Sequence, residues 1–235
     1  MSKAIGTDRE YLETQYADFW KDQTHKYGIN AWEQKIIDVI LEDGPKKCFE
    51  VGIGTGYPIA TTLLEHGVET DGCDLAASSV KEACERLGRE FNRQIFTGDL
   101  TELDVENDYD AAYCVRSSWY METDHFLKVL DRMIGMTKSG GRVVFDLMDS
   151  AYKKYFIWGI IKGRLVSFPG KVYNLLFRHK KMFFFHEKYH NREVIDGFLE
   201  TRDVEVIRTI RETDVLGPES DIKTAKVMYV VRKKQ

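Results

Sequence analysis

The run Cys48-Phe-Glu-Val-Gly-Ile-Gly-Thr-Gly56 constrains the fold of this chain more than any other stretch. It begins as an apolar, buried-type strand containing an acidic residue, and three glycines then follow at alternate positions. Glycine lets the backbone turn sharply and lets a ligand approach the main chain closely. A strand that stops in such a turn and opens into a helix is typical of a site for a nucleotide cofactor.

Strands and helices are expected to alternate around this turn. The apolar pattern predicts strands over 47–51, 69–74, 93–98, 109–115 and 142–148. It predicts helices between them over 57–66, 78–88 (with Ser78 as its cap) and 123–136. A helix over 191–201 and strands over 203–210 and 226–232 complete the pattern. This alternation predicts an α/β fold with a mostly parallel sheet covered by helices on both faces.

A chain of 235 residues is expected to form a single domain, 1–235. Within it, residues 1–45 are expected to form N-terminal helices, one over 8–28 and one that Asn30 and Glu33 open as a capping box. The remaining parts are a cofactor-binding core, an insertion, and a C-terminal helix with strands, at 46–150, 151–190 and 191–235.

The cysteines and the apolar runs bear on the compartment. Cys48, Cys73, Cys84 and Cys114 show no CxxC spacing, so we expect reduced core residues rather than a disulfide or metal set. Residues 1–10 lack the apolar core of a signal peptide, and no run of 18 apolar residues occurs. These features predict a cytoplasmic protein.

The net charge of -4 argues against a general nucleic-acid binder.

The dinucleotide fingerprint G-x-G-x-x-G/A does not fit the glycine run. Counted from Gly52 its sixth residue is Tyr57, and counted from Gly54 it is Ile59. A nicotinamide oxidoreductase is therefore disfavoured. Two carboxylates follow the next predicted strands: Asp74, suited to accept hydrogen bonds from ribose hydroxyls, and Asp99, suited to accept one from an adenine amine.

With these residues in place, the chain resembles the class I S-adenosylmethionine-dependent methyltransferases. The resemblance covers about residues 30–149 and rests on five motifs in the order and spacing of that family. They are Glu50-Val-Gly-Ile-Gly-Thr-Gly56, Asp74-Leu75, Thr97-Gly-Asp-Leu100, Tyr109-Asp-Ala-Ala-Tyr-Cys114 and Lys138-Ser-Gly-Gly-Arg-Val-Val-Phe-Asp146. It implies a Rossmann-like seven-stranded sheet whose last strand is antiparallel, and S-adenosyl-L-methionine as cofactor.

The resemblance also implies roles at matching positions. Gly52, Gly54 and Gly56 would lie against the methionine and ribose portion, Asp74 would hold the ribose, and Asp99 with the Leu100 backbone would bind adenine. Val115 and Arg116 would flank the sulfonium, with the Arg116 head turned away toward the methionine carboxylate or an acidic substrate. Glu50 and Leu75 complete the expected cofactor-binding set.

Histidine is the natural general base for a neutral hydroxyl acceptor, whereas an amine or an anion needs none. His125, after the fourth core strand, and His186 and His190, at the end of the insertion, are the candidate catalytic residues. Packing or surface roles remain the alternative for each. His186-Glu187-x-x-x-His190 departs from the zincin H-E-x-x-H motif, and no metal is expected.

The expected insertion is basic and aromatic. Residues 151–193 hold ten Lys/Arg, two Asp/Glu and 11 aromatic residues. Three interpretations remain open: a lid packed on the core, a cationic pocket for a phosphate- or carboxylate-bearing substrate, and a membrane-facing surface at 151–185 that reaches a lipid-linked substrate.

These features together predict methyl transfer to an oxygen or nitrogen of a small molecule, of anionic, sugar- or lipid-linked type. The residues after the fourth strand, Val115-Arg-Ser-Ser-Trp-Tyr120, lack the Asn/Asp-Pro-Pro-aromatic run of exocyclic-amine nucleic-acid methyltransferases, and the chain has no Pro-Cys pair. Methylation of RNA or protein and a non-catalytic, membrane-associated scaffold remain as alternatives. The sequence leaves the oligomeric state open.

Overall fold

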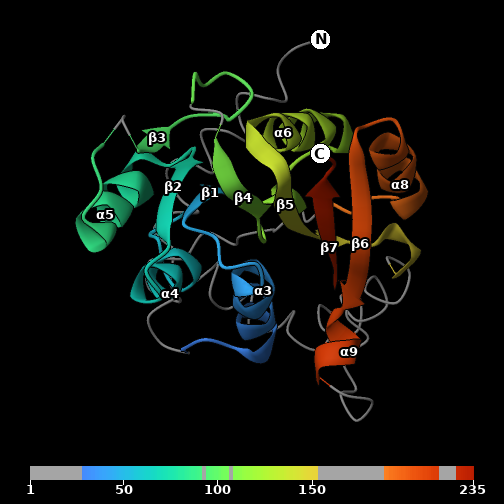
Figure 1. Cartoon of the computed structure of the whole chain (residues 1–235), viewed down its shortest axis with the longest axis horizontal. Coiled ribbons are helices and arrows are strands. Elements are labelled where there is room, and N and C mark those ends of the chain that lie inside the picture. Colours follow the sequence, from blue (N-terminus) through green and yellow to red (C-terminus); the bar gives the residue numbers. More distant parts are fainter. Residues whose placement is uncertain (1–27, 92–93, 106–107, 153–187, 217–225) are drawn as a thin grey trace, which may run out of the picture.

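The computed structural model describes residues 28–91, 94–105, 108–152, 188–216 and 226–235. In these residues one seven-stranded sheet runs in the order β3-β2-β1-β4-β5-β7-β6 (Figure 1). The strands are β1 Lys47–Val51, β2 Glu69–Asp74, β3 Ile95–Thr97, β4 Tyr109–Cys114, β5 Thr137–Met148, β6 Val204–Arg211 and β7 Lys226–Lys233.

The pairing confirms the expected mixed sheet. The pairs β1–β2, β1–β4, β2–β3 and β4–β5 are parallel, whereas β7 runs antiparallel to both β5 and β6. The strand order reverses at β1: the chain runs outward from β1 to β2 and β3, and then returns to place β4 on the other side of β1. In open α/β sheets, ligands bind at the carboxyl ends of the strands beside such a switch point.

Helices cover both faces of the sheet, as expected. Helices α3 (Ala31–Leu41) and α4 (Ile59–Glu65) pack with one apolar cluster, and α6 (Thr123–Met136) and α8 (Arg192–Glu200) pack with the cluster on the other face (Figure 1). Helix α5 (Ala77–Leu87) packs beside β3. The short elements are η2 Ser118–Tyr120, η3 Ser150–Tyr152 and α9 Glu212–Leu216. The buried clusters fix the sheet between two helical layers and so fix the loops at its ends.

Several local expectations can be compared with these bounds. The capping box at α3 is confirmed, because Asn30 accepts from the Glu33 N–H and Glu33 accepts from the Asn30 N–H. Ser78 as a cap was wrong: α5 begins after Ala76, and Asp74 accepts the Ala76 N–H instead. The third strand spans only Ile95–Thr97, and the fifth begins earlier, at Thr137.

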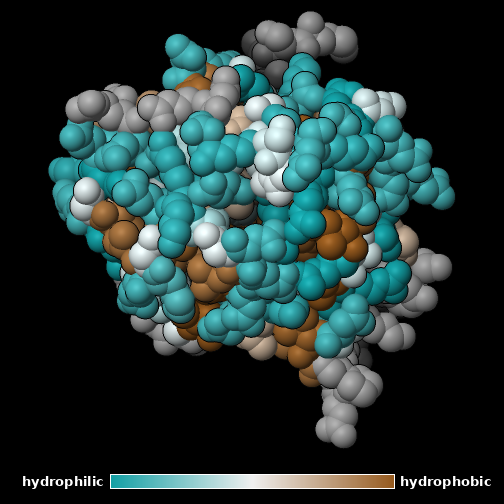
Figure 2. Space-filling model, viewed as in Figure 1, coloured by the Kyte–Doolittle hydropathy of each residue, from teal (hydrophilic) through white to brown (hydrophobic). Residues whose placement is uncertain are grey.

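The predictions for 8–28 and for most of the 151–190 insertion lie almost entirely outside the described residues. Figure 2 shows a face covered mostly by hydrophilic residues, with apolar groups in small patches. No helix among the described residues is long and apolar enough to span a membrane.

Candidate cofactor and active site

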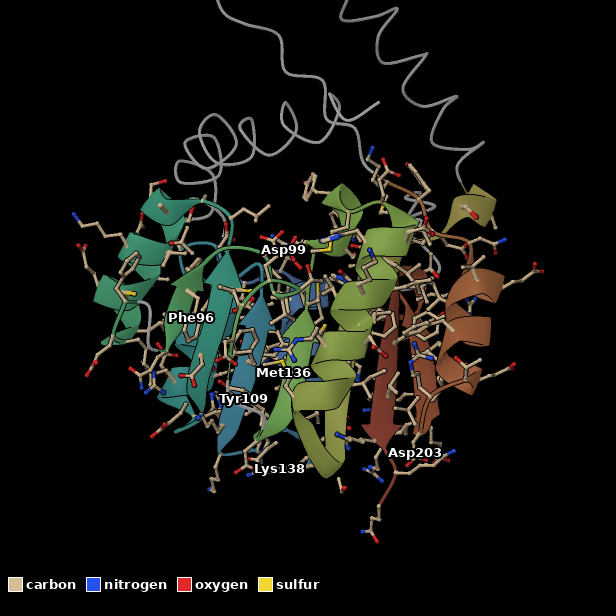
Figure 3. The ribbon with its side chains drawn as sticks, turned by 90° about the horizontal axis from the view of Figure 1, so that it is seen from above. Phe96, Asp99, Tyr109, Met136, Lys138 and Asp203 are labelled. Carbon is tan, nitrogen blue, oxygen red and sulfur yellow. The ribbon has the colours of Figure 1, made fainter. Side chains whose placement is uncertain are left out.

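Three acidic residues gather at the carboxyl edge of the sheet. Glu50 lies in β1, Asp74 ends β2, and Asp99 follows β3. Burial raises the pKa of the Cys73 thiol most strongly, and the charges of all three carboxylates raise it further. Figure 3 places Asp99 at this edge, with Lys138 and Asp203 at the opposite end of the strands. The sheet therefore brings together carboxylates that are far apart in the sequence.

The glycine turn after β1 depends on backbone conformations that favour glycine. Gly52 has φ +77°, and a Cβ there would lie 1.8 Å from the Ser117 hydroxyl, in the loop after β4. Gly54 has φ +55°, and a Cβ there would meet no atom within 4 Å. Gly52 therefore lets two loops pack together, whereas Gly54 leaves free space above its backbone for a ligand.

Asp74 ties this turn to the end of β2. Its Oδ2 accepts the Gly54 N–H at 2.9 Å, and its Oδ1 accepts the Ala76 N–H at 2.9 Å. Burial raises the pKa of Asp74, and backbone N–H groups, including that of Leu75, oppose the rise. A carboxylate offers about four acceptor positions. Asp74 can therefore hold the turn and still accept a hydroxyl hydrogen.

Glu50 is a buried carboxyl group with 6% of its surface exposed. Its Oε2 accepts the Tyr113 hydroxyl at 3.1 Å. Burial above all, with the nearby Asp74 charge, raises the pKa of Glu50 well above its usual value. No ion pair to Glu50 or Asp74 is recorded within the described part of the chain. These two carboxyl groups lie close together without a compensating cation, so a positively charged ligand would stabilise their ionised forms.

Asp99, in contrast, has a cationic partner. Its Oδ2 lies 2.9 Å from His125 Nε2, and its Oδ1 accepts the N–H and the hydroxyl of Thr101 at 2.9 and 2.8 Å. Burial alone would raise the pKa of Asp99, but the bonds from His125 and Thr101 lower it to about 2. Leu100 turns into the core and is 1% exposed. Neither the His125–Asp99 contact nor the bonds from Thr101 were indicated by a motif in the sequence.

The loop after β4 is anchored to α3. Arg116 has φ +62°, its N–H donates to Asp146 Oδ1 at 2.7 Å, and its guanidinium pairs with Glu33. The other oxygen of Asp146 accepts the Trp32 indole N–H at 3.2 Å. The preceding Val115 is buried. The Arg116 head thus turns to the protein's own Glu33, a partner that the sequence analysis did not identify.

The candidate histidines lie in different settings. His190 is fully buried, with Nε2 3.0 Å from the Ser118 carbonyl and Nδ1 3.1 Å from the Thr123 hydroxyl. Because a carbonyl only accepts, Nε2 carries the hydrogen and Nδ1 accepts from Thr123. Burial lowers the pKa of His190, which favours this neutral form. His125 lies at Asp99, and His186 is outside the described residues. The described residues contain no group of three His, Cys, Asp or Glu that could hold a metal ion.

Comparison with known proteins agrees with this geometry. Residues 49–141 match the family model of the methyltransferase domain, Methyltransf_25. No curated protein matches the chain. Among solved structures, the magnesium protoporphyrin IX methyltransferase ChlM of Synechocystis PCC 6803, with bound S-adenosylhomocysteine, is 16% identical with a TM-score of 0.68, covering 98% of this chain and 100% of that one.

Two further structures share the fold. The N-methyltransferase NodS of Bradyrhizobium japonicum WM9 is 15% identical with a TM-score of 0.57, covering 88% of this chain and 89% of that one. A chain from the complex of the Haloferax volcanii Trm112 methyltransferase activator with a methyltransferase is 13% identical with a TM-score of 0.63, covering 95% and 98%. At such identities the likeness shows the fold.

Residues 49–141 thus match a methyltransferase domain, and the sheet order is that of the fold which the chain shares with these methyltransferase structures. The residues at the carboxyl edge fit the cofactor. The space above Gly54 is open, Asp74 retains acceptor capacity, and Glu50 is an uncompensated carboxyl group suited to a ligand that carries positive charge.

A substitution of Gly54 tests whether the free space is used by the cofactor. Gly54→Ala strains a left-handed residue by about 1–2 kcal/mol and places a methyl group in that space. Gly67→Ala is the matched control, because Gly67 has φ +75°, equally free surroundings, and a position at the opposite edge. We expect Gly54→Ala and Gly67→Ala to lose a similar amount of stability, measured by chemical denaturation. Calorimetry with S-adenosylhomocysteine should show roughly tenfold weaker binding for Gly54→Ala alone. Equal affinities would contradict the assignment.

A neutral substitution of Glu50 separates stability from binding. Burial makes the pKa of Glu50 higher in the folded state than in the unfolded state. The protonated carboxyl group therefore contributes its full stability below the unfolded-state pKa, and that stability is lost as the pH rises through the folded-state pKa. Glu50→Gln stays neutral, so its stability relative to the wild type should increase with pH. One pKa unit corresponds to about 1.4 kcal/mol, and we expect a gain of at least about 1 kcal/mol at pH 8.

The same variant should bind S-adenosylhomocysteine more weakly, because it lacks the carboxylate that would pair with a positive group. The exposed Glu65→Gln serves as the control for both readouts. A stability difference that shrinks as pH rises, or an unchanged affinity, would refute this account of Glu50.

Proposed function

We propose that the protein transfers a methyl group from S-adenosylmethionine to an oxygen or nitrogen of a small molecule that carries an anionic group. In this proposal Gly52, Gly54 and Gly56 face the methionine and ribose portion of the cofactor. Asp74, with Leu75 beside it, accepts hydrogen bonds from the ribose, and Asp99 with the Leu100 backbone recognises adenine. Glu50 supplies negative charge at the methionine end, and Val115 with Arg116 borders the sulfonium.

The choice of acceptor rests on the hydrogen bonds of His125 and His190, the two described candidate histidines. Both nitrogens of His190 bond to the protein, and His125 Nε2 bonds to Asp99. His190 therefore has no free nitrogen to take a proton from a neutral hydroxyl, and His125 is held at the Asp99 side of the edge, away from the proposed sulfonium position. This favours an acceptor atom that is nucleophilic without a base, namely an amine nitrogen or a carboxylate oxygen.

When bound, the cofactor supplies an electrophilic methyl group that such an atom can attack directly. The chain's own contribution is then alignment and exclusion of water. The Arg116 backbone, bonded to Asp146, and the buried Val115 fix the wall after β4. The ion pair from Arg116 to Glu33 joins that wall to α3.

An anionic acceptor is supported by charge. Residues 151–193 hold ten basic and two acidic residues in a chain of net charge -4. The structural neighbours named above include a methyltransferase of magnesium protoporphyrin IX and an N-methyltransferase. Basic residues attract and position carboxylates and phosphates. In the sequence, the basic segment comes after β5, and ligands of open α/β sheets bind beyond the carboxyl ends of the strands.

Methyl-labelled S-adenosylmethionine and an extract from the protein's own source test this proposal. The products are separated into small aqueous, organic-soluble and macromolecular fractions and then treated with alkali. We expect label on a small anionic product, released as methanol if a carboxylate was methylated and retained if an amine was. Gly54→Ala should lower the yield, whereas Gly67→Ala should not. Label confined to RNA or protein, or no transfer despite cofactor binding, would overturn the proposal.

A further inference from the structure

We propose that His125 is a positioning residue that holds the Asp99 carboxylate for recognition of a 6-amino purine, and thereby makes this site select adenine. The inference rests on the proposed function, which assigns Asp99 to the adenine end of the cofactor. It gives His125 a role at the cofactor instead of the general-base role that its sequence position suggested.

The hydrogen bonds around Asp99 leave little freedom to the carboxylate. Oδ1 accepts two bonds from Thr101, and Oδ2 lies 2.9 Å from His125 Nε2. Three of about four acceptor positions are thus taken. The remaining position, on Oδ2, accepts one hydrogen. It matches the N–H of a 6-amino group and repels the oxygen of a 6-oxo purine, so the geometry discriminates between the two bases.

A rigid helix delivers the imidazole. His125 lies in the first turn of α6, and the adjoining Phe126 and Val129 are buried in the core. Asp99 itself lies in a turn after the three-residue β3, where a carboxylate without partners could rotate. His125 therefore holds the Asp99 carboxylate, the group that would bind the base, in a fixed position relative to α6.

The groups around His125 shift its pKa upward on balance, which favours the protonated imidazole. The bond to Asp99 raises the pKa of His125 most strongly, and burial opposes it. Lys128, one turn further along α6, lowers it, and Glu102, in the loop after β3, raises it.

Asp99 therefore has a basic partner at this end of the site, whereas Glu50 has none among the described residues. The contrast matches a cofactor that is positively charged at its amino-acid end and neutral at its base.

The experiment compares two ligands by calorimetry: S-adenosylhomocysteine and its 6-oxo analogue, S-inosylhomocysteine. His125→Ala should weaken S-adenosylhomocysteine binding roughly tenfold, with little change for the analogue, so that discrimination falls. His125→Gln retains an N–H donor of similar reach and should restore most of the discrimination between the two ligands. His66→Ala is the control, because His66 bonds to the Thr62 carbonyl at the end of α4.

The outcomes separate this inference from the proposed function. A wild type that binds neither ligand would refute the cofactor assignment itself. A wild type that binds, with unchanged discrimination in His125→Ala, would overturn the positioning role, as would an equal loss for both ligands. Should His125→Ala fail to fold, His125→Phe, which keeps a ring but no donor, is compared with His125→Gln, and equal discrimination by these two variants overturns the proposal.

Discussion

The hydrogen bonds from the glycine turn to Asp74 are the interaction on which the site depends. The Gly54 N–H and the Ala76 N–H reach opposite oxygens of one carboxylate, so the loops that follow β1 and β2 are held together. Ser117 closes against Gly52 and brings in the loop after β4. Three loops from neighbouring parallel strands thereby form one edge, and their spacing follows from backbone geometry at two glycines.

The sequence predicted this edge well because its signals are local. Glycines at alternate positions after β1, and acidic residues at the ends of β2 and β3, mark strand ends, and the expected mixed sheet with an antiparallel last strand was confirmed. Contacts between distant segments gave no such signal. His125 meets Asp99, and Arg116 meets Glu33, only after packing of α6 and α3 places them together. Ser78 failed as a cap because Asp74, already at the strand end, bonds to Ala76. The individual site roles remain predictions.

Charge along the edge varies in a way that suits the cofactor. Glu50 is buried and Asp74 is half-buried, neither has a basic partner in the described residues, and desolvation raises both pKa values. Asp99 bonds to His125 and Thr101, and these bonds lower its pKa to about 2. Uncompensated carboxyl groups destabilise the free protein, and a cationic ligand would relieve that cost. Stability and cofactor affinity therefore oppose one another at Glu50.

The most direct measurement is a calorimetric titration of S-adenosylhomocysteine into the wild-type protein and Asp74→Ala, with circular dichroism to verify folding. The account predicts one bound molecule per wild-type chain and roughly hundredfold weaker binding by the folded variant, because charge-assisted hydrogen bonds to the ribose are lost. Absence of binding by the wild type, or equal affinity in both proteins, would contradict the claim that this edge holds the cofactor.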